Sequence, residues 1–226
     1  MSIIEDSVLK AIEKNLGSLN EDYTVRSNPF ELKTELLSDK AKKLMKDVYE
    51  TSVKDLNEVS TLLEGAKRNV EPGQRSSYRD LKRDEQRLLN QSFLLASFLE
   101  NIDDQNSTLN MDTLSYMRLA RDWGTFDDWQ KDFLACALRS RSGFVLTVYS
   151  RLLERYMNIC VDEDMSGIPI GSTVAVCVCV FDGFYSRDYI GNKETYVRAM
   201  MKELNWEKIE SRIKKIEDQV KAERKQ

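Results

Sequence analysis

Apolar residues in the first half of the chain recur every three or four positions, the spacing that places side chains on one face of an α-helix. One such segment begins after Ser38 or Asp39, either of which can cap a helix, and ends near Gly65. A second segment runs from about Tyr78 to Leu99. The connector between them contains a Pro-Gly pair, which favours a turn. The pattern therefore predicts a long antiparallel helical hairpin.

The second half of the chain changes from helical spacing to short runs rich in Val, Tyr, Phe and Thr. Two helices are predicted first, over Met111–Asp122 and from a Thr125 N-cap, with Asp128 in the capping-box position, to Ser142-Gly143. Three strands follow over Phe144–Ser150, Arg155–Val161 and Thr173–Phe181, and a helix over Glu194–Leu204. Short connections favour an antiparallel sheet, and the nearly continuous apolar run of the third strand favours the central place.

Helical patterns with many charges extend both ends of the chain. Ser2–Leu16 has the pattern of a short amphipathic helix, which docks either on a partner or on its own domain. After Asn205, Ile209, Ile213, Ile216 and Val220 are spaced three and four apart and predict a last helix, either a coiled-coil arm for a partner or a solvated tail.

These boundaries divide the chain into four parts. They are an N-terminal extension (1–28), a helical hairpin domain (29–102), an α+β domain (103–206) and a C-terminal charged helix (207–226). The predicted fold class is α+β: a long antiparallel helical hairpin followed by an α/β domain with a three-stranded antiparallel sheet.

Histidine is absent from the whole sequence. Its absence excludes Ser-His and Cys-His catalysis and every metal site that depends on imidazole. None of the four cysteines (Cys136, Cys160, Cys177 and Cys179) forms a CxxC pair. Cys177 and Cys179 lie two apart on a predicted strand and point to one face. We expect buried free thiols in a reducing compartment, with a four-thiolate zinc site as the alternative.

The net charge of −4 and the isoelectric point near 5.2 give no overall attraction to nucleic acid. Local basic clusters occur at Lys42-Lys43, Arg79-Lys82-Arg83, Arg139-Arg141 and Arg151-Arg155. For each cluster we favour a solvated surface over an RNA contact. No apolar run approaches the ~20 residues of a membrane span, so we expect no membrane partner.

Several short motifs occur in a fixed order along the chain. They are Asn90-Gln91-Ser92-Phe93, Trp123-Gly124-Thr125-Phe126, Ser142-Gly143-Phe144, Val178-Cys179-Val180-Phe181-Asp182, and Asp188-Tyr189…Tyr196…Asn205-Trp206. In this order they resemble the NHTF, FGSF, SGW, VDVWE and DY…Y…NW motifs of the iron/manganese superoxide dismutase family. The resemblance covers about residues 28–208 and implies that family's fold.

The resemblance also implies a redox metal held by three histidines and one aspartate, none of which is present here. The first position falls on Met45, or on Leu44 if the register shifts by one residue; the others fall on Gln91, Cys179 and Gly183. We therefore expect no metal and no cofactor, and we expect Gln91 to be a hydrogen-bonded core amide.

The remaining positions of the family's site are equally changed. Its tyrosine close to the metal falls on Ser52 or Val53. An alternative alignment with a short gap places Asp182 on the aspartate and Ser186 on the last histidine. That alignment still leaves one carboxylate without nitrogen partners, which cannot build a redox site.

Loss of the metal with retention of the fold implies a role in surface contacts rather than catalysis. The sequence resembles the metal-less dismutase-like proteins of the small subunit of fungal mitochondrial ribosomes. This resemblance implies a non-enzymatic structural subunit in the mitochondrial matrix, in contact with small-subunit proteins and with rRNA through local basic patches. It also implies pairing with itself or a dismutase-like sister through Asp182, Phe184, Tyr185 and Tyr189, although the three aromatic residues are equally consistent with ordinary core packing.

Three alternatives lead to different experiments. The first is a dismutase with an unusual metal bound by Asp182 and thiolates. The second is a redox protein that uses Cys177 and Cys179, although neighbouring valines offer no charge that would stabilise a thiolate. The third is a free-standing adaptor homodimer.

Overall fold

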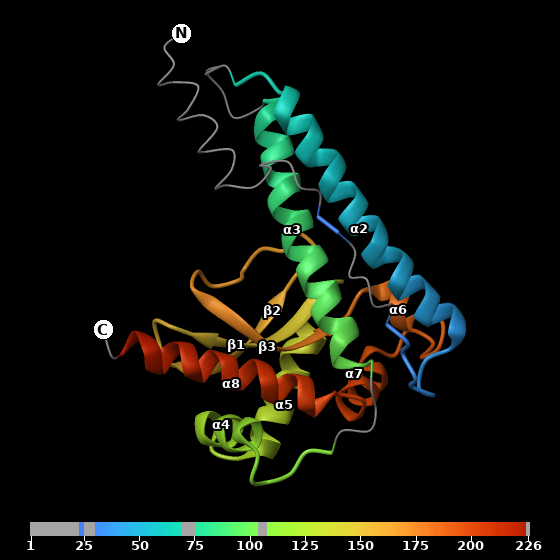
Figure 1. The fold of residues 1–226 in the computed structure, drawn as a ribbon. Coiled ribbons are helices and arrows are strands. Elements are labelled where there is room, and N and C mark those ends of the chain that lie inside the picture. The colour runs from blue at the N-terminus through green and yellow to red at the C-terminus, as the bar shows by residue number, and fades with distance from the viewer. Residues whose placement is uncertain (1–22, 25–29, 69–75, 104–107, 225–226) are drawn as a thin grey trace.

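The computed structural model describes residues 23–24, 30–68, 76–103 and 108–224, so the predicted helix over Ser2–Leu16 lies outside the described residues. Two long helices, α2 (Asp39–Gly65) and α3 (Ser77–Asn101), lie antiparallel, as predicted (Figure 1). The Ser38 hydroxyl accepts a hydrogen bond from the Ala41 amide and caps α2, and Ser76 caps α3 in the same way. Midway along the pair, the hydroxyls of Ser52 and Ser92 share a buried 2.7 Å hydrogen bond.

Two shorter helices, α4 (Leu114–Trp123) and α5 (Phe126–Arg139), begin the second half. The Thr125 hydroxyl caps α5 by accepting from the Asp128 amide at 3.0 Å, and it donates to the Asp128 carboxylate at 2.7 Å. The predicted cap is therefore present, with Asp128 bonded to the hydroxyl rather than to the backbone. Gly124 ends α4 at φ +90°, a conformation that a glycine adopts without strain.

The three strands, β1 (Phe144–Ser150), β2 (Arg155–Val161) and β3 (Ser172–Cys179), form an antiparallel sheet in the order β2-β1-β3. The predicted central place of the third strand is wrong, because β1 lies between the other two and every one of its residues is buried. The apolar character of β3 has another cause: both α3 and α8 pack against it (Figure 1).

Gly143 allows the chain to enter the sheet from α5. A Cβ atom at this position would stand 1.9 Å from the Val161 carbonyl oxygen, a distance that no side chain can occupy. The Gly143 carbonyl accepts hydrogen bonds from the Val180 amide at 2.8 Å and from the Cys179 thiol at 3.6 Å. Residue 143 is therefore glycine because the backbones of all three strand ends converge on it.

Three helices complete the chain: α6 (Asp182–Tyr185), α7 (Lys193–Lys202) and α8 (Trp206–Glu223). The sequence reading missed α6, which is a single turn without a side-chain cap. The predicted coiled-coil arm or solvated tail is wrong, because Ile209, Ile213 and Ile216 of α8 are buried in the protein's own core. None of the helices in the described parts of the chain is long and apolar enough to span a membrane.

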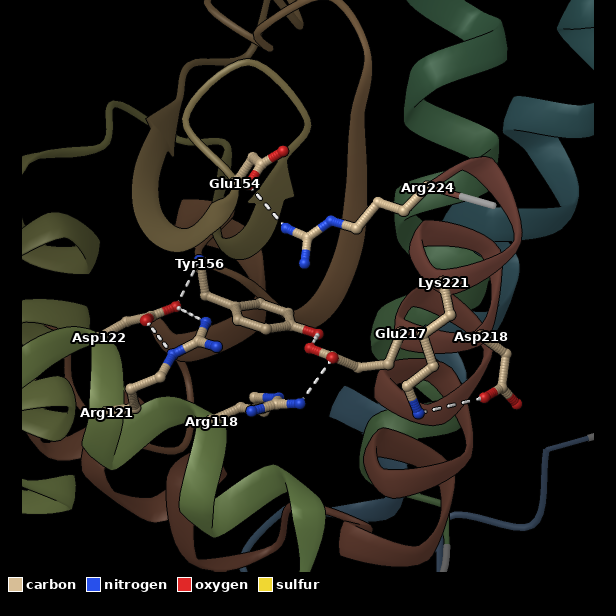
Figure 2. A network of polar contacts seen from close by, with 9 residues as sticks. All are labelled: Arg118, Arg121, Asp122, Glu154, Tyr156, Glu217, Asp218, Lys221 and Arg224. Atoms are coloured by element: carbon tan, nitrogen blue, oxygen red, sulfur yellow. Dashed lines mark hydrogen bonds and ion pairs between the residues drawn. The ribbon is translucent and has the colours of Figure 1, made fainter. Parts of the chain in front are cut away.

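Polar contacts also hold α8 in place (Figure 2). Glu217, 9% exposed, accepts hydrogen bonds from Arg118 of α4 at 2.8 Å and from the Tyr156 hydroxyl at 3.4 Å. The Tyr156 amide in turn donates to Asp122 at 2.7 Å, and Arg121 contacts both oxygens of that carboxylate. This network joins the end of α8 to α4 and β2, so the last helix is an integral part of the domain.

Candidate functional site

A cavity of about 550 Å³ opens where the helical hairpin meets α6 and the loop after β2. Its walls are formed by α2, α3, the end of the sheet with α6, and two loops. The lining residues are Leu44 and Val48 of α2; Arg87 and Gln91 of α3; Phe181, Asp182, Gly183 and Phe184 at the end of the sheet and in α6; and Ser142, Glu163 and Asp164 of the loops. Its wall is apolar at Leu44, Val48 and the two phenylalanines and polar elsewhere. This cavity holds three of the positions to which the sequence comparison assigned the dismutase ligands.

Leu44 and Gly183 meet in this cavity. The Leu44 Cδ2 atom lies 3.8 Å from the point where a Cβ on Gly183 would stand. Met45, the residue assigned to the first ligand position, is fully buried in the hydrophobic core and does not line the cavity. The residue of α2 that lines the cavity is thus Leu44, the alternative assignment for the first ligand position. Sequence alone left the register open because both residues are apolar and adjacent on the helix.

Gln91 lies on the cavity wall, half-buried, and its Oε1 atom accepts a hydrogen bond from Arg87 Nη1 at 3.1 Å. The two residues are four apart on α3 and therefore share a face. The amide is hydrogen-bonded as expected, but it is at the edge of the core rather than inside it. The positively charged guanidinium of Arg87, which is bonded to Gln91 Oε1, would repel a metal cation brought to that oxygen.

Cys179 is fully buried, and its thiol donates to the Gly143 carbonyl. Burial raises the pKa of this thiol well above its usual value. Cys177, on the same face of β3, donates to the Leu94 carbonyl at 3.4 Å, and burial raises its pKa likewise. Both groups are neutral thiols at physiological pH, whereas the thiolate is the form that binds metals or attacks a substrate.

Asp182 is exposed at the mouth of the cavity. Its carboxylate accepts a hydrogen bond from the Tyr185 hydroxyl at 2.5 Å, and its amide donates to Ser142 Oγ at 3.4 Å. Burial, and next the bond to this carboxylate, raise the pKa of Tyr185 to about 12. Asp182 therefore acts here as an acceptor for its own helix turn.

The aromatic residues predicted at a partner interface make contacts within the chain. Phe184 and Tyr185 are buried, at 2% and 6% exposure, and the Phe184 ring stacks on Phe98 with centroids 6.4 Å apart. Tyr189 is half-buried and donates through its hydroxyl to the Leu36 carbonyl at 2.7 Å. Pairing through this segment stays a prediction, and among the four residues Asp182 is the most open to solvent.

The donor groups near the cavity do not fit the metal of the dismutase family. Ser52, at the position of the family's tyrosine, is bonded to Ser92. No three His, Cys, Asp or Glu side chains come together in the described part of the chain as a metal site requires. Leu44 and Gly183 have no donor side chain, and Ser186, the last position in the gapped alignment, is exposed. A four-coordinate or five-coordinate redox ion therefore has too few donors here.

Comparisons with known proteins agree with the fold and its motifs. Residues 113–212 match the profile of iron/manganese superoxide dismutases, C-terminal domain. The second half of this chain is therefore similar to that domain. The match includes α4, α5, the whole sheet, α7 and the first turns of α8, with Gly143, Cys179 and Gly183 inside it.

Individual relatives are enzymes of low sequence identity. An iron superoxide dismutase of Cupriavidus metallidurans is 26% identical over 167 residues, which cover 73% of this chain and 82% of that protein. A manganese superoxide dismutase of Halobacterium salinarum is 28% identical over 92 residues, covering 41% of this chain and 46% of that protein. One from Haloferax mediterranei is 32% identical over 82 residues, covering 36% of this chain and 56% of that protein.

Proposed function

We propose that this dismutase-like protein is a non-catalytic structural subunit, and that its place is the small subunit of the mitochondrial ribosome in the mitochondrial matrix. The observation that carries the first part is that Leu44 and Gly183 face each other across the cavity: Leu44 Cδ2 lies 3.8 Å from where a Cβ on residue 183 would stand. The resemblance to the dismutases puts histidines at these two positions. A leucine methyl group occupies the space facing a residue without a side chain. Both residues are exposed on the cavity wall, and neither side chain offers a donor atom of the kind with which a dismutase binds its metal.

One continuous set of apolar contacts joins the two halves of the fold. The core extends without a break from Met45 and Leu95 of the hairpin to Val178 and Ile213 of the second domain. Hydrophobic burial of this kind stabilises a fold independently of any ligand. Retention of the scaffold with replacement of the family's metal donors supports a role in assembly over one in catalysis.

The surface charge supports contacts made mainly with proteins. Several cations of the basic clusters already face carboxylates: Lys42 lies 4.0 Å from Asp39, and Arg79 lies 3.7 Å from Asp80. Arg151 forms a 2.5 Å ion pair with Glu223. These pairs reduce the local positive potential that phosphate contacts need. We therefore place rRNA contacts second to contacts with other small-subunit proteins and with a second dismutase-like chain.

Two measurements test the proposal separately. Elemental analysis and a superoxide-consumption assay of the purified protein test the non-catalytic role; we expect iron, manganese and zinc far below one per chain and no activity above buffer. Stoichiometric metal with activity would overturn it. Sedimentation of tagged protein from mitochondrial extract at moderate salt tests the ribosomal place; we expect it with the small subunit. If the tagged protein instead sediments as a homodimer in the light fractions, the result would contradict the ribosomal place and favour the free-standing adaptor homodimer.

A further inference from the structure

A second cavity, of about 730 Å³, lies between α5 and α7 and shares no residue with the candidate site. Its apolar surface is formed by Leu109, Phe126, Leu134, Met201 and Trp206. The lining residues of α5 recur at 126, 130 and 134, and those of α7 at 198, 201 and 202, so the facing sides of the two helices form the walls. The space is therefore a groove with an apolar floor between two helices.

The residues that line this groove include three cations and one carboxylate, although the chain as a whole has a net charge of −4. Lys131 stands on the α5 wall, and Arg198 and Lys202 stand on the α7 wall. Asp127 is the acidic residue among those that line the groove. Cations on both sides of an apolar floor are complementary to a ligand that is apolar on one face and negatively charged along both edges.

Two of these cations have partners that they can exchange. Lys131 lies 3.0 Å from Asp128, and Arg198 lies 2.8 Å from Glu194. All four side chains are roughly half exposed or more, at 76% and 48% in the first pair and 60% and 51% in the second. Such exposed pairs contribute little to stability, so a ligand carboxylate can compete with Asp128 and Glu194 for these cations at little loss to the fold.

We propose that this groove binds an acidic amphipathic helix of a partner protein. The α5 wall from 126 to 134 is about 12 Å long at 1.5 Å per residue, which matches about two turns of a docked helix. Apolar side chains at i, i+3 and i+4 of that helix would enter the floor, and its flanking Glu or Asp side chains would face Lys131, Arg198 and Lys202. The proposal does not depend on the ribosomal role.

The aromatic rings of the floor favour a peptide over RNA. Phe126 is 8% exposed, with its ring centroid 5.0 Å from Tyr116 and 4.9 Å from Trp129. Trp206 packs edge-on against both Phe126 and Trp129, at 5.7 and 5.8 Å. A nucleic-acid platform needs open ring faces on which bases stack. These rings are engaged with one another and offer aliphatic side chains a surface to pack on.

The test uses fluorescence anisotropy of the full chain with three labelled probes. The first is a helix of about 14 residues with leucines at i, i+3, i+4 and i+7 and flanking glutamates. The second replaces those glutamates with lysines, and the third is a single-stranded RNA of about 14 nucleotides. The rim variant combines Lys131→Glu, Arg198→Glu and Lys202→Glu. The matched control combines Lys54→Glu, Lys214→Glu and Lys215→Glu, three exposed residues outside the groove with the same change in charge.

We expect the acidic helix to bind the wild-type chain and to lose at least about tenfold in affinity with the rim variant, while the control stays within about twofold. The basic helix should prefer the rim variant. The proposal is overturned if the acidic helix does not bind the wild-type chain or if rim and control variants weaken it equally. It is also overturned if the RNA binds more tightly than the acidic helix and depends on the same rim residues.

Discussion

Arg212 of α8 donates a hydrogen bond to the Asn101 side chain at the end of α3, with 2.5 Å between Nη1 and Oδ1. The same guanidinium contacts the Glu100 carboxylate at 2.5 Å and the Ser97 carbonyl at 3.3 Å. Asn101 also bonds to the sheet, because its Nδ2 atom donates to the Cys177 carbonyl of β3 at 2.8 Å. One arginine thus joins the helical hairpin, the sheet and the last helix.

Removal of this arginine should destabilise the whole chain. Arg212→Ala removes the guanidinium from the half-buried Glu100 carboxylate and from the buried Asn101 side chain. We expect a loss of about 3 kcal/mol in the free energy of unfolding, measured by urea titration. Arg151→Ala is the control, because its ion pair with Glu223 is about half exposed on both sides, and its loss should be below about 1 kcal/mol. Equal losses would contradict a central role of Arg212.

Gly143 provides a second test of how the two halves of the fold meet. Gly143→Ala places a methyl group 1.9 Å from the Val161 carbonyl oxygen, so the β1–β2 pairing must separate at that end. We expect a loss above about 4 kcal/mol, or failure to fold. Gly65→Ala, where a Cβ meets no atom within 4 Å, should be neutral or slightly stabilising. Thermal unfolding followed by circular dichroism distinguishes the two variants.

The buried thiols predict how stability depends on pH. Burial raises the pKa of Cys177 and Cys179 in the folded chain, so the folded state keeps protons that the unfolded state releases above about pH 8.5. Stability contributed by these groups is present below that pH and falls as pH rises above it, by up to about 1.4 kcal/mol per pH unit and thiol.

Urea unfolding at pH 7 and pH 10 measures this effect. The double variant Cys177→Ala/Cys179→Ala should be less stable than the wild type at pH 7 because it leaves cavities, and its stability should depend less on pH. Cys160, which is exposed, should react with a thiol reagent in the folded chain before the two buried residues do. An unchanged pH dependence in the double variant would show that other groups cause the loss at high pH.

The elements of this fold were predictable where local patterns decide them. The helices α2 and α5 begin at serine and threonine caps that can be read directly, and short runs rich in Val, Tyr, Phe and Thr located the sheet. The order of the strands was not predictable from β3 itself. Its residues are apolar because α3 and α8 pack against it, and not because it lies in the middle of the sheet. The packing of α8 was missed for a similar reason: a charged outer face looks the same on a free helix and on a docked one.

The candidate site shows the same limit. The motif around Gly183 located one wall of the cavity, and Asn90–Phe93 located another. Which of two adjacent apolar residues faces Gly183 depends on the rotation of α2, and a sequence pattern fixes that rotation only to about one residue. In the structure α2 buries Met45, Tyr49, Val53 and Leu56, and the Ser52–Ser92 hydrogen bond lies on the same buried face.

This rotation of α2 leads to a prediction about rebuilding a metal site. The variant Leu44→His/Gln91→His/Gly183→His introduces three imidazoles beside the native Asp182 carboxylate, the donor types of the dismutase family. All four positions line one cavity, so we expect this variant to retain manganese or iron at up to about one ion per chain after dialysis, with three nitrogen donors and one oxygen donor.

The matched control has Met45→His in place of Leu44→His and is otherwise identical. Met45 is 0% exposed in the core and does not line the cavity, so its imidazole cannot join the other two. We expect this control to bind at least about tenfold less metal and to be less stable, because it buries an unpaired polar ring. Elemental analysis after dialysis and urea titration give both readouts. Equal metal content in the two variants would mean that α2 does not present Leu44 to Gly183.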